Sequence, residues 1–307
     1  MKNVSRCSAG ECHKITNQLR LSISREEIAV LYQEDAEIIA NRQVADFIFE
    51  IDLNVPKIAN CAMPGQFVQI KITQSIDPLL RRPFSIFAAD SAAGKISILY
   101  KVIGKGTKIL SKKCSGERLN LLGPLGNGFD FSAQKCSGHL NILVGGGLGI
   151  APLVFLAEKM KSLNNKILVL YGVTTAQEIV CIDELKKIDC ELKIATDDGS
   201  TGFNGYASDL LADFLCANEN NDFKNPYIYA CGPFALLKQV HRLSEQYCFH
   251  GQVCLEKMMG CGLGVCLGCM VKIKNSGAQT GFSYQRVCKD GPVFDLHLVD
   301  WKNEKVS

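Results

Sequence analysis

Four cysteines near the C-terminal end constrain the fold of this chain most strongly, because their spacing suits the ligands of one inorganic centre. The spacing is Cys261-x4-Cys266-x2-Cys269, and Cys288 follows after a further 18 residues. Glycines between these thiols would let the backbone wrap such a centre with its amides pointing at the sulfurs. An x4-x2 spacing with a distant fourth cysteine is typical of plant-type [2Fe–2S] ligation. Zinc is the rival occupant, although structural zinc sites usually show two close cysteine pairs.

The chain has 15 cysteines among its 307 residues, so the redox state of its compartment matters. Its polar first 40 residues lack the apolar core of a signal peptide. The apolar stretch from Ile142 to Ala157 is too short and too rich in glycine to span a membrane. We therefore expect a cytoplasmic protein with no membrane contact, whose other cysteines pack as small hydrophobes. The formal net charge of +3 gives no sign of a nucleic-acid-binding surface.

Two different periodicities of apolar residues divide the chain into domains. Between about residues 37 and 122, short segments such as 47–53 and 67–72 alternate apolar with polar side chains, and turn signals separate them. This alternation predicts a small antiparallel barrel or sandwich. After Gly138, apolar strands alternate with helical patterns, which predicts a parallel sheet with its ligand at the carboxyl ends of the strands. The strands are expected at 142–144, 167–171, 192–196 and 226–231, and one helix near 176–187.

A glycine-rich turn, Gly145-Gly146-Gly147-Leu148-Gly149, joins the first of these strands to a helix. Glycines let the backbone approach a pyrophosphate, which the amides at the helix N-terminus then stabilise. The Rossmann fingerprint itself is not satisfied, because Ile150 stands at the third glycine position, and a plain tight turn is the alternative. Two further strand ends support a nucleotide site, namely residues 196–200 and Cys231-Gly232-Pro233.

The segment Arg81-Arg82-Pro83-Phe84-Ser85 offers guanidinium and hydroxyl donors at the start of a barrel strand. An arginine here can bind phosphate oxygens with two parallel hydrogen bonds. A solvated arginine pair at a strand entry is the simpler interpretation of these residues alone. A second turn that suits phosphate, Gly104-Lys105-Gly106-Thr107, follows the expected strand over 96–102.

Taken in order, these motifs resemble the ferredoxin–NADP reductase superfamily. The run Cys-Gly-x-Gly-x-Cys-x-Gly-Cys, followed by residues 286–294, is most similar to the electron-transfer subunits of class 1B (NAD-dependent) dihydroorotate dehydrogenases. The resemblance covers about residues 38–301. It implies a multidomain β plus α/β fold with three parts, an antiparallel FAD-binding β-barrel at 34–135, a parallel-sheet NAD-binding α/β domain at 136–250 and a small [2Fe–2S] module at 251–307. Residues 1–33 lie outside the resemblance and form an extension of unknown role.

The resemblance also assigns residues to each cofactor. The expected FAD contacts are Arg82, Pro83, Phe84, Ser85, Leu99, Tyr100, Lys101, Gly106 and Thr107. The expected NAD contacts are Gly145, Gly146, Gly147, Gly149, Cys231, Gly232 and Pro233. The expected cluster ligands are Cys261, Cys266, Cys269 and Cys288. NAD is favoured over NADP because the loop at 172–178 has no arginine for a 2′-phosphate.

The function implied by the resemblance is electron transfer. Electrons would pass from the FMN of a dihydroorotate dehydrogenase catalytic subunit through [2Fe–2S] and FAD to NAD, in de novo pyrimidine (UMP) biosynthesis. The expected assembly is a heterotetramer with two copies of each subunit. Because such a subunit only positions and tunes its cofactors, we expect no acid–base pair and no catalytic side chain in this chain.

Two other functions stay open at this point. One is another NAD(P)H-linked flavin and iron–sulfur reductase subunit, of the ferredoxin or sulfide reductase type. The other is a redox-sensing or zinc-bearing regulatory subunit that binds nucleotide without turnover and has no flavin. The five histidines show no ligand spacing, so we expect them to be structural or exposed.

Overall fold

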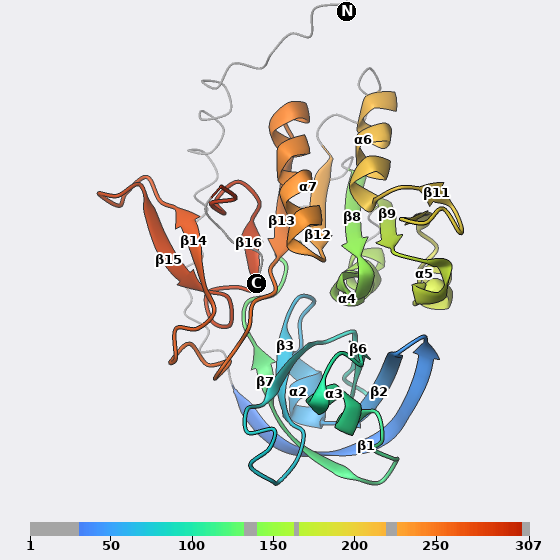
Figure 1. Cartoon of the computed structure of the whole chain (residues 1–307), viewed down its shortest axis with the longest axis vertical. Coiled ribbons are helices and arrows are strands. Elements are labelled where there is room, and N and C mark those ends of the chain that lie inside the picture. Colours follow the sequence, from blue (N-terminus) through green and yellow to red (C-terminus); the bar gives the residue numbers. More distant parts are fainter. Residues whose placement is uncertain (1–30, 132–139, 163–165, 219–225, 303–307) are drawn as a thin grey trace, which may run out of the picture.

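A computed structural model describes residues 31–131, 140–162, 166–218 and 226–302, and its two large sheets are packed one above the other (Figure 1). The predicted extension at 1–33 falls almost wholly outside the described residues. The first described strand already begins at Tyr32, within that segment. The domain boundaries at 135/136 and 250/251 stay predictions.

The lower sheet is the predicted antiparallel barrel, with strand order β4-β3-β7-β1-β2-β6-β5. Its two edges are joined through Ile86 and Phe87. The amide of Ile86 donates to the carbonyl of Gln66 over 3.0 Å, and that of Phe87 to the carbonyl of Ser97 on β6 over 2.9 Å. Its elements are β1 (Tyr32–Ala45), β2 (Ile48–Asn54), α2 (Pro56–Cys61), β3 (Phe67–Lys71), β4 (Arg82–Ser85), β5 (Ala88–Asp90), β6 (Lys95–Lys101), α3 (Lys105–Leu110) and β7 (Arg118–Leu125).

The alternation over 47–53 predicted the strand correctly but not the surroundings of its acidic residues. Glu50 and Asp52 are buried at 9% and 6% exposure, whereas Phe47 is 65% exposed in a tight turn with φ of 57°. The Arg42 guanidinium pairs with both carboxylates, over 2.7 Å to Glu50 and 3.2 Å to Asp52. The second domain covers this outer face of the barrel, so the polar side of β2 lies in the interface between the two domains. Burial raises the pKa of Glu50, although Arg42 opposes the shift.

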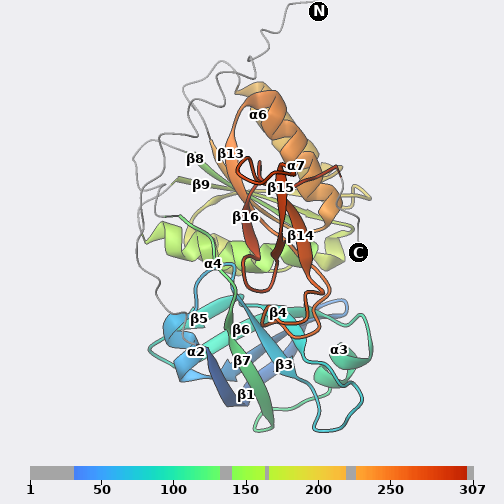
Figure 2. The same ribbon diagram turned by 90° about the vertical axis from the view of Figure 1, so that its left-hand side faces the viewer.

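The upper sheet has the order β11-β10-β9-β8-β12-β13-β16, and all neighbours are parallel except the last pair. Helices α4 and α5 share a core with one face, and α6 and α7 with the other; α4 lies between the two sheets (Figure 2). The strands are β8 (Leu140–Gly146), β9 (Lys166–Val173), β10 (Glu191–Thr196), β11 (Phe203–Asn204), β12 (Tyr227–Cys231), β13 (His250–Cys254) and β16 (Val293–Asp295). The helices are α4 (Ile150–Lys161), α5 (Ile182–Ile188), α6 (Ala207–Ala217) and α7 (Phe234–Tyr247).

The prediction of a helix near 176–187 was wrong for the N-terminal part of that range. A short 3₁₀ turn covers Ala176–Glu178, the chain then runs extended, and α5 begins only at Ile182. Cys181 has φ of 66°, the left-handed region, so the chain changes direction immediately before the helix. The sequence did not predict β13 or β16. Both strands belong to the cysteine-bearing segment or its border, and they complete one edge of the upper sheet.

The cysteine-bearing segment also forms a hairpin, β14 (Met270–Lys274) and β15 (Phe282–Arg286), at one side of the molecule (Figure 1). This segment has no separate core. Val271, Val299 and Trp301 share one apolar cluster with Val240 of α7 and Phe67 of β3. The segment therefore depends on both neighbouring domains for its burial.

Trp301 anchors this segment against two rings of α7, those of Phe234 and His241. It is 3% exposed, its indole NH donates to the carbonyl of Leu296 over 2.8 Å, and it stacks on His241 with centroids 5.6 Å apart. His241, His250 and His297 lie together here, with ring centroids 5.5 to 6.0 Å apart. Burial lowers the pKa of His241 to about 4, so this ring packs in its neutral form. His13 and His139 fall outside the described residues.

Replacing Trp301 by alanine should cost about 3–5 kcal/mol of unfolding free energy, because it leaves a cavity and an unpaired carbonyl. Urea unfolding followed by circular dichroism measures the loss. Replacing the neighbouring exposed Lys302 by alanine should change it by less than about 0.5 kcal/mol. Equal stability of the Trp301→Ala and wild-type chains would contradict the anchoring role.

Candidate cofactor sites

The structure brings the four predicted cluster cysteines into one region. Three lie in the loop between β13 and β14, and Cys288 follows β15. Cys269 and Cys288 are each 2% exposed, whereas Cys266 is exposed. Backbone amides point at three of the sulfurs: Leu263 and Cys266 at Cys261 (3.2 and 3.5 Å), Gly264 at Cys288 (3.1 Å) and Cys288 at Cys269 (3.4 Å).

Glycines give the loop the path that these amides require. Gly262 and Gly264 have φ of 73° and 79°, the left-handed region in which a side chain would be strained. A Cβ on Gly260 would lie 3.2 Å from the Cys266 sulfur, and one on Gly268 would lie 3.6 Å from it. The loop therefore leaves space around the Cys266 sulfur on both sides.

The pKa values of two of these thiols are shifted in opposite directions. Burial opposes ionisation of Cys261, but hydrogen bonds from the amides of Cys266, Leu263 and Val265 together lower its pKa to about 6. Desolvation and the adjoining Cys269 thiol raise the pKa of Cys288 to about 12. Within the described ranges, no three His, Cys, Asp or Glu side chains are spaced around a single metal ion. The donor set, four thiols with amides directed at the sulfurs, fits an iron–sulfur cluster, whose positive iron would compensate the buried thiolates.

The two arginines of the expected FAD segment hold different parts of the barrel. Arg81 donates to the carbonyls of Asn120 (2.8 Å) and Gln69 (3.3 Å) and to the side-chain oxygen of Asn120. Arg82 donates to the carbonyls of Leu80 (2.7 Å) and Arg81 (3.3 Å) and lies against the first turn of α3, where a Cβ on Gly106 would be 3.4 Å from its Nε. The Thr107 hydroxyl accepts hydrogen bonds from the amides of Ile103 and Gly104 and so fixes this turn. The Arg82 guanidinium and the Gly106 backbone thus form one cradle suited to phosphate.

The other expected FAD residues divide between core and surface. Phe84 and Tyr100 pack edge to face inside the barrel at 5.9 Å, and the Tyr100 hydroxyl donates to Asn41 over 2.8 Å. Burial raises the pKa of Tyr100 to about 12. Pro83, Ser85 and Leu99 lie on the opposite side of their strands from this pair. The Lys101 ammonium pairs with Glu178 of the upper domain over 2.7 Å.

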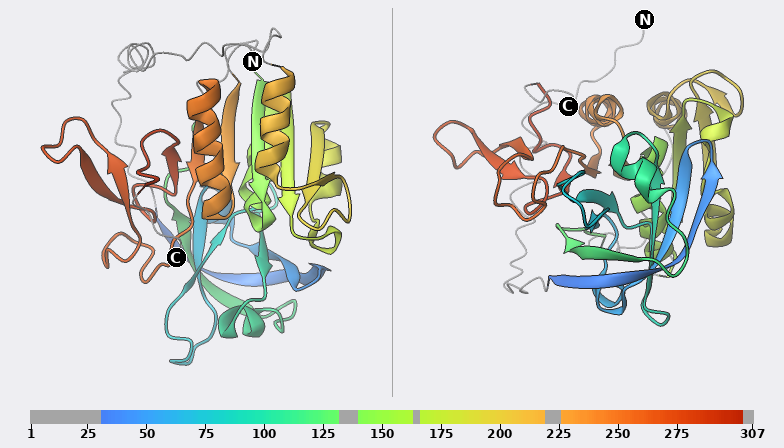
Figure 3. Two further views of the ribbon diagram at one scale, coloured as in Figure 1. Left: turned by 45° about the horizontal axis from the view of Figure 1, so that its top comes forward. Right: turned by 60° about the horizontal axis from the view of Figure 1, so that its bottom comes forward.

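The expected NAD residues meet at the carboxyl edge of the upper sheet, which faces the barrel (Figure 3). A Cβ on Gly149 would overlap the carbonyl of Cys231, and one on Gly146 would lie 2.9 Å from the Pro233 ring. The expected loop at 196–200 is held to the loop after β9, since the amide of Asp197 donates to the carbonyl of Val173 over 3.0 Å and the Ser200 hydroxyl accepts from the amide of Ala176 over 2.8 Å. Close backbone approach is what a bound pyrophosphate requires.

Glu256 is a residue at this edge that the sequence reasoning missed. It lies two residues after the end of β13, where Cys254 pairs with Cys231. Its side chain is accessible, yet the surrounding protein desolvates it and raises the pKa of its carboxyl. Recognising residues 250–254 as a parallel strand would have placed Glu256 at the ligand edge.

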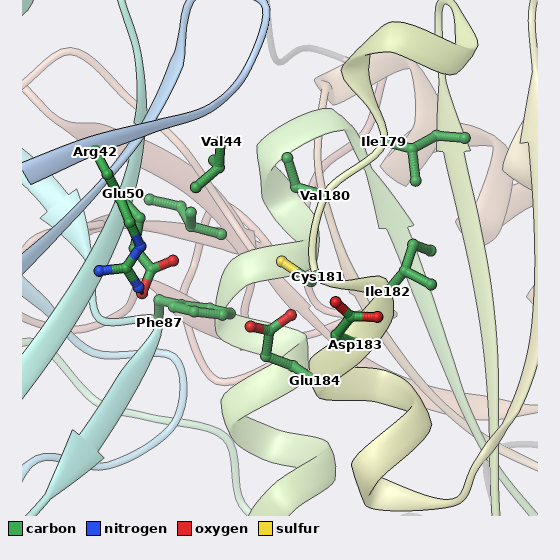
Figure 4. A pocket seen from close by; sticks show the side chains of 11 residues that line it. Arg42, Val44, Glu50, Phe87, Ile179, Val180, Cys181, Ile182, Asp183 and Glu184 are labelled. Carbon is green, nitrogen blue, oxygen red and sulfur yellow. The ribbon is translucent and has the colours of Figure 1, made fainter.

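A cavity of about 340 Å³ lies between the barrel and the segment before α5 (Figure 4). It borders Leu99, but its polar lining is mainly acidic: Glu50, Asp183 and Glu184 face one guanidinium, Arg42, which is already paired. Such a lining repels phosphate. The phosphates of a dinucleotide therefore suit the Arg82 cradle and not this cavity.

Three family models match the three parts of the chain. They are the oxidoreductase FAD-binding domain over residues 35–129, the oxidoreductase NAD-binding domain over 143–242, and the iron–sulfur cluster binding domain of dihydroorotate dehydrogenase B over 256–300. The chain is 37% identical over 269 residues to the dihydroorotate dehydrogenase B (NAD(+)) electron transfer subunit of Desulforamulus reducens, covering 87% of this chain and 98% of that protein. The chain belongs to the family of dihydroorotate dehydrogenase B electron transfer subunits.

Membership in this family makes the chain an NAD-linked FAD oxidoreductase subunit with an iron–sulfur module. The subunit of Geobacillus thermodenitrificans is also 37% identical, over 265 residues that cover 85% of this chain and 96% of that protein. The predicted fold class and the three predicted cofactors are confirmed. No helix in the described part of the chain is long and apolar enough to cross a membrane.

Solved structures agree on the fold. The structure of an NADH-dependent reduced ferredoxin–NADP oxidoreductase, studied for flavin-based electron bifurcation, matches with a TM-score of 0.74 and 28% identity, over 87% of this chain and 90% of that one. A ferredoxin–NADP⁺ reductase from Neisseria gonorrhoeae with bound FAD and NADP matches with a TM-score of 0.58 and 16% identity, over 68% and 89% of the two chains. The second likeness supports the fold alone.

Replacing Cys266 by serine should abolish the visible absorption of the cluster, because a ligand thiolate is lost at its most exposed corner. Absorption spectra and iron content of the purified variant measure the loss. Cys216→Ser, which changes another exposed free thiol, serves as the control and should keep both. Full iron content in the Cys266→Ser chain would show that the ligand assignment is wrong.

Replacing Arg82 by alanine should weaken FAD binding by about 10- to 100-fold, the equivalent of one lost charged hydrogen bond. Dialysis followed by flavin fluorescence gives the dissociation constant. Arg118→Ala is the matched control, because Arg118 is exposed and donates only to the Asp35 carbonyl among its described hydrogen bonds. Unchanged FAD affinity in Arg82→Ala would remove this residue from the site.

Proposed function

We propose that this chain passes electrons from the FMN of a dihydroorotate dehydrogenase catalytic subunit through a [2Fe–2S] cluster and FAD to NAD, in de novo pyrimidine (UMP) biosynthesis. The observation that carries this proposal is the order of the sites. The cysteine loop lies against β3 of the barrel, and the glycine turn of the upper sheet faces the barrel from another side. The flavin segment therefore stands between the other two sites.

The chemistry of the three groups accounts for this order. A flavin exchanges electrons singly with an iron–sulfur cluster and as a hydride with a nicotinamide. This chain's own residues have the task of holding and separating the groups. Arg82, Gly106 and Thr107 would bind the FAD phosphates, with Pro83, Ser85, Leu99 and Lys101 beside the flavin, and Phe84 and Tyr100 would support these strands from inside the barrel. Gly145, Gly146, Gly147, Gly149, Cys231, Gly232 and Pro233 would line the NAD site.

The Lys101–Glu178 ion pair supports NAD as the nucleotide. Glu178 follows β9 within the loop expected to contact the ribose, and it places a carboxylate there. A carboxylate at this position suits ribose hydroxyls, and the loop contains no arginine that would bind a 2′-phosphate. We therefore propose that the subunit uses NAD in preference to NADP.

The surface around the cluster loop supports a partner subunit. Val265 and Leu267 flank the exposed Cys266 and are 78% and 57% exposed, and Met258, 79% exposed, lies earlier in the same loop. Grouped exposed apolar side chains usually mark a protein interface. We propose that the FMN-containing catalytic subunit docks here, in a heterotetramer with two copies of each subunit.

The cysteines also support a cytoplasmic location. None of the twelve cysteines within the described ranges forms a disulfide. Exposed free thiols such as Cys61 and Cys114 persist in a reducing compartment.

A second candidate is an NAD(P)H-linked reductase of the ferredoxin or sulfide reductase type. Its support is the likeness to the reduced ferredoxin–NADP oxidoreductase structure at a TM-score of 0.74. The identity to that chain is 28%, against 37% to the dihydroorotate dehydrogenase B subunits. The two candidates differ in their electron partner.

Co-expression with the catalytic subunit from an organism such as Desulforamulus reducens tests the first candidate. The two chains should co-purify and oxidise dihydroorotate with NAD as acceptor, and the catalytic subunit alone should not use NAD. The Cys266→Ser chain is the control that should co-purify without activity. NADPH-driven reduction of ferredoxin by this chain, without any dihydroorotate-linked activity, would support the second candidate instead.

A further inference from the structure

The Gln69 side chain lies between the flavin strand and the loop that carries three of the cluster cysteines. Gln69 is fully buried on β3, and it pairs in register with Pro83 of β4. Its neighbours Val68 and Ile70 point into the barrel core, so Gln69 points out of the barrel. On that side it meets the cysteine loop.

The contact with the loop is made at Gly262, directly after the ligand Cys261. A Cβ built on Gly262 would lie 2.5 Å from Nε2 and 2.6 Å from Cγ of Gln69. The backbone of Gly262, with φ of 73°, is therefore seated against this side chain. Hydrogen bonds from Asn127 to the carbonyls of Lys289, Asp290 and Gly291 secure a different part of the module, next to Cys288.

Hydrogen bonding does not explain the presence of Gln69. Its Oε1 has no partner among the described residues, and its Nε2 approaches the Met259 sulfur at 3.9 Å. A buried acceptor without a partner lowers stability. What the side chain supplies is length, because it reaches from the flavin strand to the loop.

We propose that Gln69 is a positioning residue that sets the separation between the cluster and the flavin. This proposal rests on the proposed function, since it concerns electron transfer between those two groups. The rate of electron transfer falls steeply as two centres move apart, so a loop that settles differently changes the rate. Gln69 is the register partner of Pro83 in the flavin segment, and it contacts Gly262, the residue after a cluster ligand. Its length therefore controls the distance between the two groups directly.

Two variants test this, Gln69→Ala, which removes the reach, and Gln69→Met, which keeps the length without the amide. Anaerobic stopped-flow mixing with NADH follows flavin reduction and cluster reduction as separate absorbance changes. In Gln69→Ala, cluster reduction should slow by about tenfold or more, while flavin reduction keeps its rate. Gln69→Met should restore most of the rate, because it conserves volume. Gln74→Ala, at an exposed glutamine of the next loop, is the control.

A second readout does not depend on turnover. After chemical reduction, the EPR spectrum of the cluster should be altered in Gln69→Ala and close to wild type in Gln69→Met. A fully loaded Gln69→Ala chain with wild-type rate and spectrum would overturn the proposal. So would cluster loss or slow transfer in both variants, because the amide would then be needed and not the reach. If the wild-type chain itself holds no cluster that NADH reduces, the proposed function fails and not this inference.

Discussion

The burial of thiolates is the constraint on which the rest of the structure depends. Cys269 and Cys288 lie in the same apolar cluster as Phe67 of the barrel and Val240 of the upper domain. Charge in such surroundings is costly unless a cation and hydrogen bonds compensate it. The amides of Gly264 and Cys288 supply part of this compensation, and iron supplies the rest. A cysteine module without its own core therefore needs both domains around it.

That dependence places the sites relative to one another. The module can be buried only in the angle between the two sheets, and its loop then contacts β3 beside the flavin segment. The upper sheet directs the ends of its parallel strands at the same region. The ion pair between Lys101 and Glu178 joins the domains on the nucleotide side. One apolar cluster thus packs the cysteine module against both neighbouring domains.

Local signals made much of this predictable from sequence. The spacing of Cys261, Cys266 and Cys269, the glycines at 145–149 and the Arg82 segment depend on a few adjacent residues, and so do the strand rhythms. What could not be predicted depends on contacts across domains. Glu50 is buried because the upper domain covers it, and α5 starts late because Cys181 turns the chain. The meeting of Gln69 with Gly262 joins residues 193 positions apart, and no local pattern announces it.

In the proposed function, electrons move between NAD and the cluster by way of the flavin. The order of reduction after NADH is mixed with the cofactor-loaded chain without oxygen tests this path. The flavin absorbance should fall first and the cluster absorbance should follow, and a chain stripped of FAD should keep its cluster oxidised. Reduction of the cluster by NADH in the FAD-free chain would contradict it.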